Sequence, residues 1–390
     1  MSAFLHFECS VCGEPTTPSG PVGFAHCCGA PLLARYDLER ANEALPTRDA
    51  AGALGVWRYR AVLPLADRVE IVSLGEGGTP LVSLDRLSAE HGVEILAKDE
   101  SGNPTGSFKD RGMSVAVTLA RAAGVPGLVL PTAGNAGAAA AAYGARAGLP
   151  VSIHAPDTTP PEILAEIRLR GARLTLHPGS IADAGRAASA EAAETGYFPV
   201  ATFREPGRVE GKKTMAYEVF EQLGRVPDAI VYPCGGGTGV VAMARAFDEL
   251  EAMGRIGPER PAFFAVQASG CAPIVRAFAA GDSTAEPWPD PVTFAAGLRV
   301  PVAFADRLIL DALRRTGGGA VAVSDSEIAD AGRELAGREG LLPCPEGAAA
   351  WAGARRLLRQ DTWRPGASVV VFQTGSALKY LADWNRLLRT

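Results

Sequence analysis

From Thr79 onward, short apolar runs rich in β-branched residues alternate with longer, Ala-rich stretches of helical periodicity. The apolar runs predict strands at 93–98, 127–131, 151–155, 173–177, 229–232, 262–266 and 368–372. The stretches between and after them predict helices at 113–123, 137–147, 163–170, 181–194, 214–223, 240–251 and 327–339. Strands that alternate with helices indicate parallel sheets covered by helices on both faces. In such folds ligands bind at loops that follow the carboxyl ends of strands.

Length and composition leave room for two such domains and a small appended module. The chain has 390 residues, of which 47% are hydrophobic and 21% are charged, as in ordinary globular proteins. The first 35 residues are rich in cysteine and turn-forming residues, and a helix is expected over 37–44. A stretch rich in Pro and Asp at 281–291 predicts a surface loop.

The charge pattern argues against several classes of protein. The net charge is −5 and the basic residues are not clustered, so binding to nucleic acid or to an anionic membrane gains no electrostatic support. No apolar run reaches membrane-spanning length, and the first ten residues lack the basic and apolar regions of a secretory signal. We therefore expect a cytoplasmic protein whose partner is a small molecule.

The first loop that offers chemistry is SGNPTGSFKDRG at 101–112, which follows a predicted strand and leads into a predicted helix. It carries Lys109, one of only five lysines among 38 basic residues. The positive end of a helix dipole and partial burial both lower the pKa of an amine, and a lysine that forms a Schiff base must be a free amine. The triphosphate-binding pattern G-x-x-x-x-G-K-[ST] is not met, because Phe108 precedes the lysine and Asp110 follows it.

The second loop is PTAGNAG at 131–137, and it also joins a predicted strand to a predicted helix. Its small residues let a ligand approach the backbone, and consecutive amide groups can form a nest for a carboxylate. Asn135 offers both a donor and an acceptor to a cofactor hydroxyl. The alternative interpretation is an ordinary helix cap with Asn135 in a turn.

The third loop is CGGGTG at 234–239, where four glycines and a hydroxyl come directly before a predicted helix. This pattern indicates a cradle for a small phosphate. The competing interpretation is a dinucleotide site, because 237–242 matches G-x-G-x-x-A. A dinucleotide fold wants an acidic residue at the end of the next strand, and that strand ends at Gln267. A dinucleotide site would also leave Lys109 without a role.

Together the three loops resemble the fold-type II pyridoxal phosphate (PLP) enzymes, the tryptophan synthase β-like family, and among them the threonine synthases. The resemblance covers about 74–380. The segments that carry it are GEGGTPL (75–81), NPTGSFKDRG (103–112), AGNAG (133–137), EPGRVEGKKT (205–214), PCGGGTG (233–239), AAGLRVP (295–301), PEGAAA (345–350) and QTGSALKY (373–380). NPTGSFKDRG is highly specific, whereas the glycine loops alone are not.

The resemblance implies a role for each matching residue. Lys109 is similar to the Schiff-base lysine, Asn135 to the partner of the cofactor's 3-hydroxyl, and Thr374 to the hydroxyl that faces the pyridine nitrogen. The implied phosphate cradle is Gly235, Gly236, Gly237, Thr238 and Gly239, and the implied frame of the substrate α-carboxylate is Thr132, Ala133, Gly134 and Ala136. Arg208 matches the arginine expected to hold a substrate phosphate, since Arg binds phosphate with two parallel hydrogen bonds; the alternative is an ordinary surface charge.

The resemblance also implies a reaction and an assembly. The reaction is conversion of O-phospho-L-homoserine and water to L-threonine and phosphate, in which Lys109 shuttles protons at Cα and Cβ. The implied fold is α/β, with two three-layer α/β/α domains that have mainly parallel sheets, plus the N-terminal Cys-rich module that looks like a zinc ribbon. Expected boundaries are 1–35 for the module, 36–112 and 205–390 for the large PLP-binding domain, and 113–204 for a small domain that closes over the substrate. A homodimer is expected from the resemblance only.

Two positions depart from the pattern expected of near relatives. Ile163 and Leu164 stand where a lysine is expected, and Gly207 stands where a tyrosine is usual. The loss of a cation weakens the case for a phosphorylated substrate. Other β- or γ-replacement or elimination chemistry therefore stays open, either of a cysteate-synthase-like enzyme or of a threonine or serine dehydratase, and an NAD-dependent oxidoreductase remains a more distant alternative.

The N-terminal cysteines suggest a separate metal site. Four of the seven cysteines fall within the first 28 residues, which resembles a metal site more than a disulfide framework. Cys9, Cys12, His26 and Cys28 can supply the two short ligand pairs of a structural zinc ribbon. The alternative is a degenerate ribbon that has lost its metal.

Overall fold

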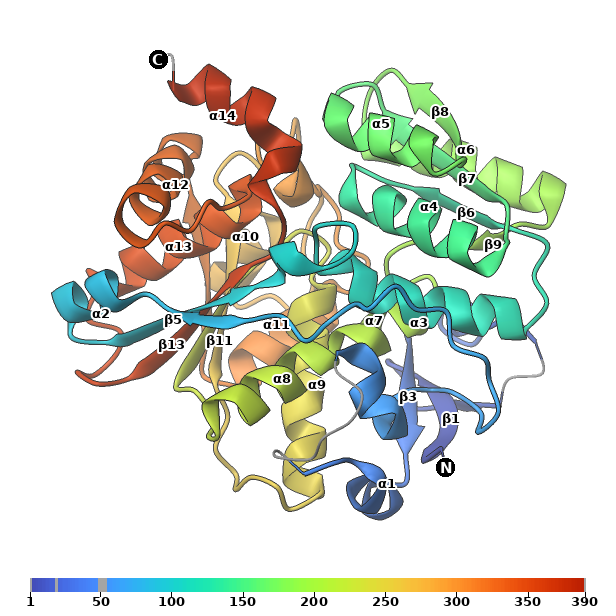
Figure 1. Ribbon diagram of the computed structural model, residues 1–390, viewed down its shortest axis with the longest axis horizontal. Helices are drawn as coiled ribbons and strands as arrows, with labels where there is room; N and C mark the ends of the chain where they lie inside the picture. Colours follow the sequence, from blue (N-terminus) through green and yellow to red (C-terminus); the bar gives the residue numbers. More distant parts are fainter. Residues whose placement is uncertain (1, 18–19, 48–54, 389–390) are drawn as a thin grey trace.

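The structure is a computed structural model, and it describes residues 2–17, 20–47 and 55–388. Residues 1, 18–19, 48–54 and 389–390 belong to the expected module and large domain but lie outside the described residues. Three sheets organise the described chain: a six-stranded sheet, a four-stranded sheet and a three-stranded sheet. Figure 1 shows the four-stranded sheet and its helices set to one side of the larger body.

The six-stranded sheet forms the centre of the larger body. Its strand order is β12 (Gly319–Val323), β11 (Ala262–Ala268), β10 (Ala229–Pro233), β13 (Ser368–Gln373), β5 (Glu94–Asp99) and β4 (Leu81–Ser83). All neighbouring strands are parallel except β4, which runs antiparallel to β5 at the edge. The strand that comes last in the sequence, β13, thus lies between β10 and β5.

Alternate side chains of this sheet enter two different cores, as the two-residue period of a strand requires. Val369 and Val371 pack into a core with α2 (Asp85–His91), α12 (Asp325–Glu339) and α13 (Pro345–Leu358). Val370 and Phe372 pack into the opposite core with α8 (Thr214–Leu223), α9 (Thr238–Ala252), α10 (Pro273–Ala280) and α11 (Asp306–Arg315). The larger body is therefore a three-layer α/β/α sandwich.

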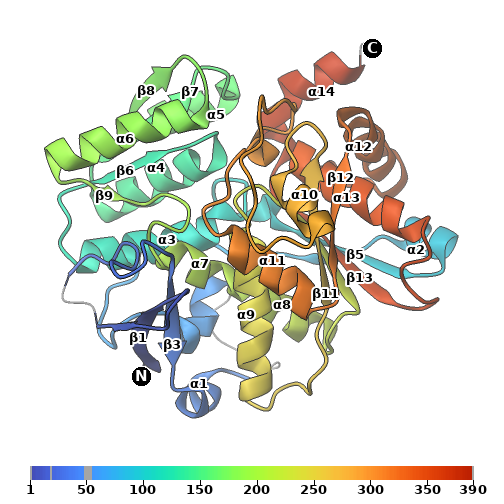
Figure 2. The same cartoon turned by 180° about the vertical axis from the view of Figure 1, so that it is seen from behind.

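The four-stranded sheet is wholly parallel and has its own helical layers. Its order is β8 (Arg173–His177), β7 (Val151–Pro156), β6 (Leu128–Pro131) and β9 (Phe198–Pro199). α4 (Asn135–Ala147) and α5 (Pro161–Leu169) cover one face and α6 (Ile181–Thr195) covers the other, as Figures 1 and 2 show from opposite sides. All of these elements fall within 113–204.

Two short connections tie the domains together. α3 (Lys109–Ala122) leaves the β5 loop and leads to β6, and α7 (Gly207–Lys212) packs closely against it. The packing is tight enough that a Cβ on Gly207 would come within 2.8 Å of Ala116 Cα. A tyrosine at position 207 would therefore force these two helices apart, which explains why this chain departs from the usual residue.

The N-terminal module is an antiparallel sheet of β1 (Phe4–Cys9), β2 (Pro15–Thr16) and β3 (Leu32–Tyr36), followed by α1 (Leu38–Ala44). It docks on α7 and α9 through buried polar contacts. Tyr36 donates to Glu210 Oε2 at 2.8 Å, and Arg245 donates to the backbone carbonyl of Ala34 at 2.7 Å. The strand β3 thus contacts the helix that carries Arg208, and Figure 2 shows the two elements close together.

The predicted α/β class, the two three-layer domains and the mainly parallel sheets are confirmed, and each of the seven predicted strands is present. From Thr79 onward the pattern missed the short strands β4, β9 and β12 and the helices α2, α7, α10, α11 and α13, and it set the starts of α3, α4 and α9 two to four residues too late. None of the described helices is long and apolar enough to cross a membrane. A further helix, α14 (Leu381–Leu388), ends the described chain.

Candidate active site

The topology brings the first and third predicted loops to one edge of the large sheet. β10, β13 and β5 are neighbours, and their carboxyl ends lead into the Gly-rich loop, Thr374 and the Lys109 loop respectively. Backbone hydrogen bonds join the last two loops: Phe108 N donates to Thr374 O at 3.1 Å, and Ser376 N donates to Gly106 O at 2.8 Å. Segments that are far apart in the sequence, at 106–108 and at 374–376, thus lie side by side.

Lys109 begins α3 and sits in a partly buried position. Its ammonium nitrogen lies 3.8 Å from the centre of the Phe108 ring. Burial and the nearby positive charge of Arg208 lower the pKa of Lys109 to about 7, although Glu346 acts in the opposite direction. Near neutral pH, much of this lysine is therefore a free amine, the form that attacks a carbonyl carbon.

The Gly-rich loop has no space for larger residues. A Cβ on Gly235 would lie 2.2 Å from the carbonyl oxygen of Gly297, and one on Gly239 would lie 2.3 Å from Tyr232 Oη. Gly237 has a φ of +72°, a conformation that favours glycine, and it comes just before the first residue of α9, Thr238. These contacts require glycine at positions 235, 237 and 239.

The amide groups of this loop are available to a ligand. The described structure gives no acceptor to the backbone N–H groups of Gly235, Gly236, Gly237, Thr238 and Gly239, and no side chain caps α9. An uncapped helix N-terminus attracts an anion through its free N–H groups and its dipole. These free amides are compatible with the predicted phosphate cradle at 235–239, which stays a prediction.

The β6–α4 loop holds its shape through Thr132. The hydroxyl oxygen of Thr132 accepts from the N–H groups of Gly134 and Gly137, both at 3.0 Å. Within the described structure, the N–H groups of Ala133, Asn135 and Ala136 have no acceptor. The free amides, and not the hydroxyl of Thr132, are thus the groups that this loop offers to a carboxylate.

Asn135 lies beside the segment that follows Thr374, because a Cβ on Gly375 would be 3.6 Å from Asn135 Nδ2. The side chain of Asn135 donates to Tyr380 Oη at 2.8 Å and accepts from Lys379 Nζ at 3.2 Å. The Thr374 hydroxyl is buried and lies 3.6 Å from Cys344 Sγ. The prediction that these residues contact a bound cofactor stays a prediction, because their present partners are residues of the protein.

Arg208 is a buried residue, so the interpretation of this arginine as a surface charge is wrong. Its side chain is 2% exposed, and one guanidinium nitrogen donates to the carbonyl oxygen of Val200 at 2.9 Å. The Nε–H group of Arg208 has no partner in the described structure. Burial lowers the pKa of Arg208, and the buried carboxyl of Glu205 partly offsets that effect.

Sequence reasoning missed three residues of this site. Lys212 Nζ, Glu346 Oε2 and Tyr232 Oη are buried and have no hydrogen-bond partner within the described structure. One signal was available for Lys212, because it is one of the five lysines and stands four residues after Arg208, on the same face of a helix. For Glu346 and Tyr232 only the fold shows their proximity to Lys109 and to Gly239.

The residues present fit a PLP molecule. Buried polar atoms without partners are rare in proteins, and here several surround the Lys109 amine, which suggests that they await a ligand. The cradle at 235–239 suits the cofactor phosphate, and Lys109, Asn135 and Thr374 suit its aldehyde, its 3-hydroxyl and its pyridine nitrogen. The competing dinucleotide role loses support, because Gln267 points inward and donates to the carbonyl oxygen of Cys234 at 3.1 Å.

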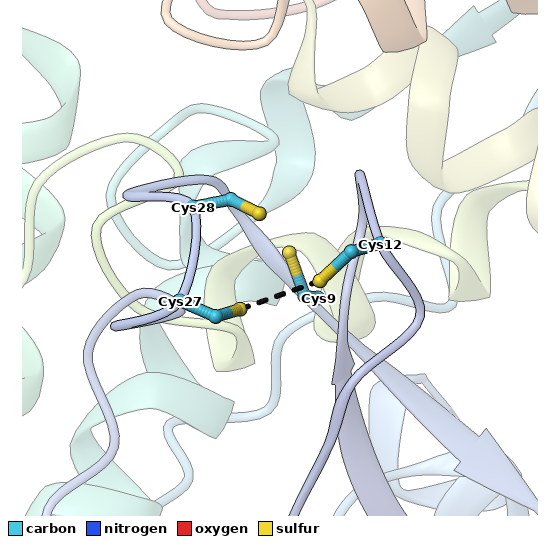
Figure 3. A group of neighbouring side chains, drawn as sticks. All are labelled: Cys9, Cys12, Cys27 and Cys28. Carbon is cyan, nitrogen blue, oxygen red and sulfur yellow. Dashed lines mark hydrogen bonds between the residues drawn. The ribbon is translucent and has the colours of Figure 1, made fainter.

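The N-terminal cysteines also converge, with one correction to the predicted set. Figure 3 shows the sulfurs of Cys9, Cys12, Cys27 and Cys28 facing one another, all within 4.8 Å. The predicted ligand His26 is exposed and is not in this group, and Cys27 takes its place. Turn geometry explains the difference, since the turn points the side chains of residues 27 and 28 to the same side, toward Cys9 and Cys12 (Figure 3).

Comparisons with known proteins agree with this geometry. The model of the family "Pyridoxal-phosphate dependent enzyme" matches residues 72–375. A threonine synthase of Methanocaldococcus jannaschii is 36% identical over 380 residues, which cover 95% of this chain and 92% of that protein. A threonine synthase of Methanosarcina acetivorans is 34% identical, with 96% and 92% of the two chains covered.

Solved structures show the same fold at lower identity. A fungal L-serine ammonia-lyase from Rhizomucor miehei superposes with a TM-score of 0.69 at 24% identity, covering 80% of this chain and 98% of that chain. The processed form of threonine deaminase isoform 2 from Solanum lycopersicum gives 0.67 at 24% identity, covering 79% and 87%. From the family match and the extent of its likeness to the threonine synthases, the chain belongs to the pyridoxal-phosphate dependent enzyme family, as a relative of the threonine synthases.

Proposed function

We propose that the protein is a threonine synthase, a PLP-dependent carbon–oxygen lyase that converts O-phospho-L-homoserine and water to L-threonine and phosphate. The observation that carries the proposal is identity of 36% to a threonine synthase over almost the whole chain. The site adds chemical support, because the unpartnered Nε–H of Arg208 lies near Lys109 and offers a position for the substrate phosphate.

Each residue of the site has a task in this reaction. The bound cofactor supplies an electron sink for negative charge at the substrate carbons. Lys109, with a pKa lowered to about 7, accepts and returns protons at Cα and Cβ. The free amides of Ala133, Asn135 and Ala136 hold the α-carboxylate, and Arg208 holds the phosphate until it leaves from Cγ. A proton then adds at Cγ, which becomes the methyl group of threonine, and water adds at Cβ.

Thr374 favours elimination and replacement over reactions that need a long-lived carbanion. A neutral hydroxyl opposite the pyridine nitrogen does not hold that nitrogen protonated as a carboxylate would. Negative charge at Cα is then less stabilised, so loss of the leaving group competes well with the slower reactions of a carbanion.

Residues 163 and 164 fit a substrate contact that is apolar, since Ile163 packs against Gly134 of the carboxylate loop.

Release of inorganic phosphate from O-phospho-L-homoserine by the PLP-loaded protein tests the proposal. We expect equal amounts of phosphate and threonine. Ammonia and a keto acid formed from serine or threonine, without phosphate release, would instead identify a dehydratase. Sulfite-dependent formation of cysteate from a phosphorylated serine would identify a cysteate-synthase-like enzyme.

We also propose that the N-terminal cysteines bind a structural zinc ion. Sulfurs around tetrahedral zinc lie about 3.8 Å apart, and Cys12 Sγ and Cys27 Sγ are 3.4 Å apart. The proposed ligands are Cys9, Cys12, Cys27 and Cys28.

A pair of variants separates this ligand set from the one that includes His26. We expect Cys27→Ser to lose most of the bound zinc and His26→Ala to retain it, as measured by elemental analysis of the purified proteins. Retention of zinc by Cys27→Ser together with loss in His26→Ala would restore the original set. Absence of zinc from the wild-type protein as well as from both variants would indicate a degenerate ribbon.

The assembly and the domain motion are proposals as well. We propose a cytoplasmic homodimer, in line with the family resemblance, in which 113–204 closes over the substrate bound to the large domain. Support for the closure comes from two contacts across the boundary: Lys379 Nζ lies 2.7 Å from Glu166 Oε2, and Tyr380 accepts from Asn135. Sedimentation analysis and structures with and without substrate test both points.

A further inference from the structure

Two consecutive lysines on one turn have opposite surroundings. Lys213 is buried and its ammonium group lies 2.7 Å from the carboxylates of both Glu210 and Glu249. Lys212 is equally buried, with 0% of its side chain exposed, yet its ammonium group has no hydrogen-bond partner within the described structure. A buried charge without a partner costs several kcal/mol, so an arrangement of this kind needs a compensating purpose.

Lys212 and the catalytic lysine approach the same aromatic ring, and the charge of Lys109 acts on Lys212. The nitrogen of Lys212 lies 5.6 Å from the centre of the Phe108 ring, and the nitrogen of Lys109 lies 3.8 Å from the same centre. Lys212 also stands four residues after Arg208, which places both cations on one face of α7. The two side chains share a further property, because Arg208 Nε and Lys212 Nζ are both buried and unpartnered.

The charges around this position do not balance in the protein alone. The ionisable groups that act on Lys212 are Arg208, Lys109 and the single carboxyl of Glu205. Burial and the two cations lower the pKa of Lys212 well below its usual range. A ligand with two negative charges would supply the missing counter-charge and the missing acceptors, and a phosphate monoester has both properties.

We propose that Lys212 is a phosphate-binding residue of the active site, which together with Arg208 receives the phosphate of a phosphate monoester. This inference deepens the proposed function and rests on it where it names the substrate class. It assigns to Lys212 the cationic contact that is missing at 163 and 164, where the chain has Ile and Leu. The phosphate belongs either to the substrate side chain or to the cofactor.

Three measurements on the full-length protein test the role of Lys212. Calorimetric titration of the PLP-loaded protein with inorganic phosphate gives the affinity for the anion. Phosphate release from O-phospho-L-homoserine gives KM and kcat. Absorbance titration of the cofactor-free protein gives the affinity for PLP. The test variants are Lys212→Met and Lys212→Gln, and the control is Lys213→Met, which removes a neighbouring buried cation outside the site.

Loss of one charge-assisted hydrogen bond predicts that both Lys212 variants weaken phosphate binding by about 10- to 100-fold. An equal rise in KM with unchanged PLP affinity identifies the substrate phosphate. A matching loss of PLP affinity identifies the cofactor phosphate instead. We expect Lys212→Met to unfold at the same or a higher temperature than the wild type, whereas Lys213→Met unfolds at a lower temperature and keeps its KM.

The proposal is overturned if both Lys212 variants keep the phosphate affinity, KM and PLP affinity of the wild type within about twofold, a change below the usual effect of one hydrogen bond. It is equally overturned if the wild-type protein binds no inorganic phosphate and PLP affinity is unchanged in Lys212→Met. Failure of the proposed function looks different: the wild type then releases no phosphate from O-phospho-L-homoserine, while the titrations with inorganic phosphate and PLP still decide the role of Lys212.

Discussion

Two clusters of buried charged residues, one around Arg111 and one around Lys109, differ in how many of their polar atoms have hydrogen-bond partners. Around Arg111, every guanidinium nitrogen donates to an oxygen: the partners are Glu100, Glu218, Thr79 and Thr214, at 2.6 to 3.1 Å. Lys98 joins this cluster at 2.8 Å from Glu218. Around Lys109, by contrast, Arg208 and Lys212 keep polar atoms without partners.

The difference suggests a structural role for Arg111 and a functional role for Lys109, although the two residues are close in the sequence. Arg111 stands two positions after Lys109, and both are on the first turn of α3. The bonded cluster ties β5, α3 and α8 together, since its members come from each of these elements or from the loops beside them. The unbonded cluster lies around Lys109, and in our proposal a ligand phosphate supplies the missing partners. Burial alone therefore does not separate the two clusters; the difference lies in how many of their polar atoms have partners.

The largest effect is expected for Lys109→Ala. Removal of the amine eliminates the covalent attachment of PLP and the proton transfers at Cα and Cβ, so catalysis falls by about 10²- to 10⁴-fold or more. The absorption band of the lysine-bound cofactor should vanish, as recorded by visible spectroscopy. Lys98→Met is the matched control, because this buried lysine belongs to the bonded cluster. Loss of the band in the control and its persistence in Lys109→Ala would reverse the comparison.

The next effect concerns stability. Arg111→Met leaves Glu100 and Glu218 buried without their main partner, and breaking a buried ion pair in this way costs about 3–5 kcal/mol of unfolding free energy. Denaturant unfolding of the two proteins measures the difference. A loss of unfolding free energy below about 1 kcal/mol, the range of an exposed ion pair, would contradict a stabilising role of the Arg111 cluster.

A smaller effect is expected from pH. Because the pKa of Lys109 is lowered to about 7, the free amine grows about tenfold per unit as pH rises toward 7 and then levels off. The rate of PLP capture by the cofactor-free protein should follow this curve in stopped-flow absorbance. A rate that keeps rising tenfold per unit up to about pH 10 would indicate an ordinary lysine pKa and no effect of the cluster on Lys109.

The same shift has a consequence for folding, and its sign follows from proton binding. Between about pH 7 and the ordinary lysine pKa near 10, the unfolded chain binds a proton that the folded chain lacks, so stability rises with pH. Below about pH 7, the folded state carries the full cost of a buried ammonium. Lys109→Met should therefore stabilise the cofactor-free protein more at pH 6 than at pH 9 in thermal unfolding, and an equal effect at both values would contradict the lowered pKa.

Much of the fold follows from local patterns. Each predicted strand is an apolar run bounded by Gly or Pro, and the fold class follows from the alternation of such runs with helices. β12 escaped this reasoning because its sequence, GAVAV, is short and small, and α13 begins with Pro345 and Gly347 and lacks a clear polar face. α9 starts two residues before the predicted start. Its first turn contains Gly239 and no side chain caps it, so the usual sequence signals of a helix start are absent.

Only the parts of the site that lie within a single loop, and so form a recognisable motif, could be predicted from the sequence. Lys109 and the cradle are recognisable because their neighbours in sequence are also their neighbours in space. The order β10–β13–β5 is invisible to sequence periodicity, so nothing in the pattern shows that Thr374 lies beside Phe108. Whether Lys212 has a hydrogen-bond partner depends on every side chain that packs around it. No local feature of the sequence distinguishes Lys212 from Lys213 in this respect.

Identification of the lysine that carries PLP tests the account most directly. Reduction of the PLP-loaded protein with borohydride fixes the cofactor to its lysine, and peptide mapping by mass spectrometry then locates it among Lys98, Lys109, Lys212, Lys213 and Lys379. We predict that the modified peptide contains Lys109 and that the peptides with the other four lysines are unmodified. Attachment to Lys212 or Lys379, or no attachment at all, would contradict the assignment of the catalytic amine and of the phosphate-binding residues around it.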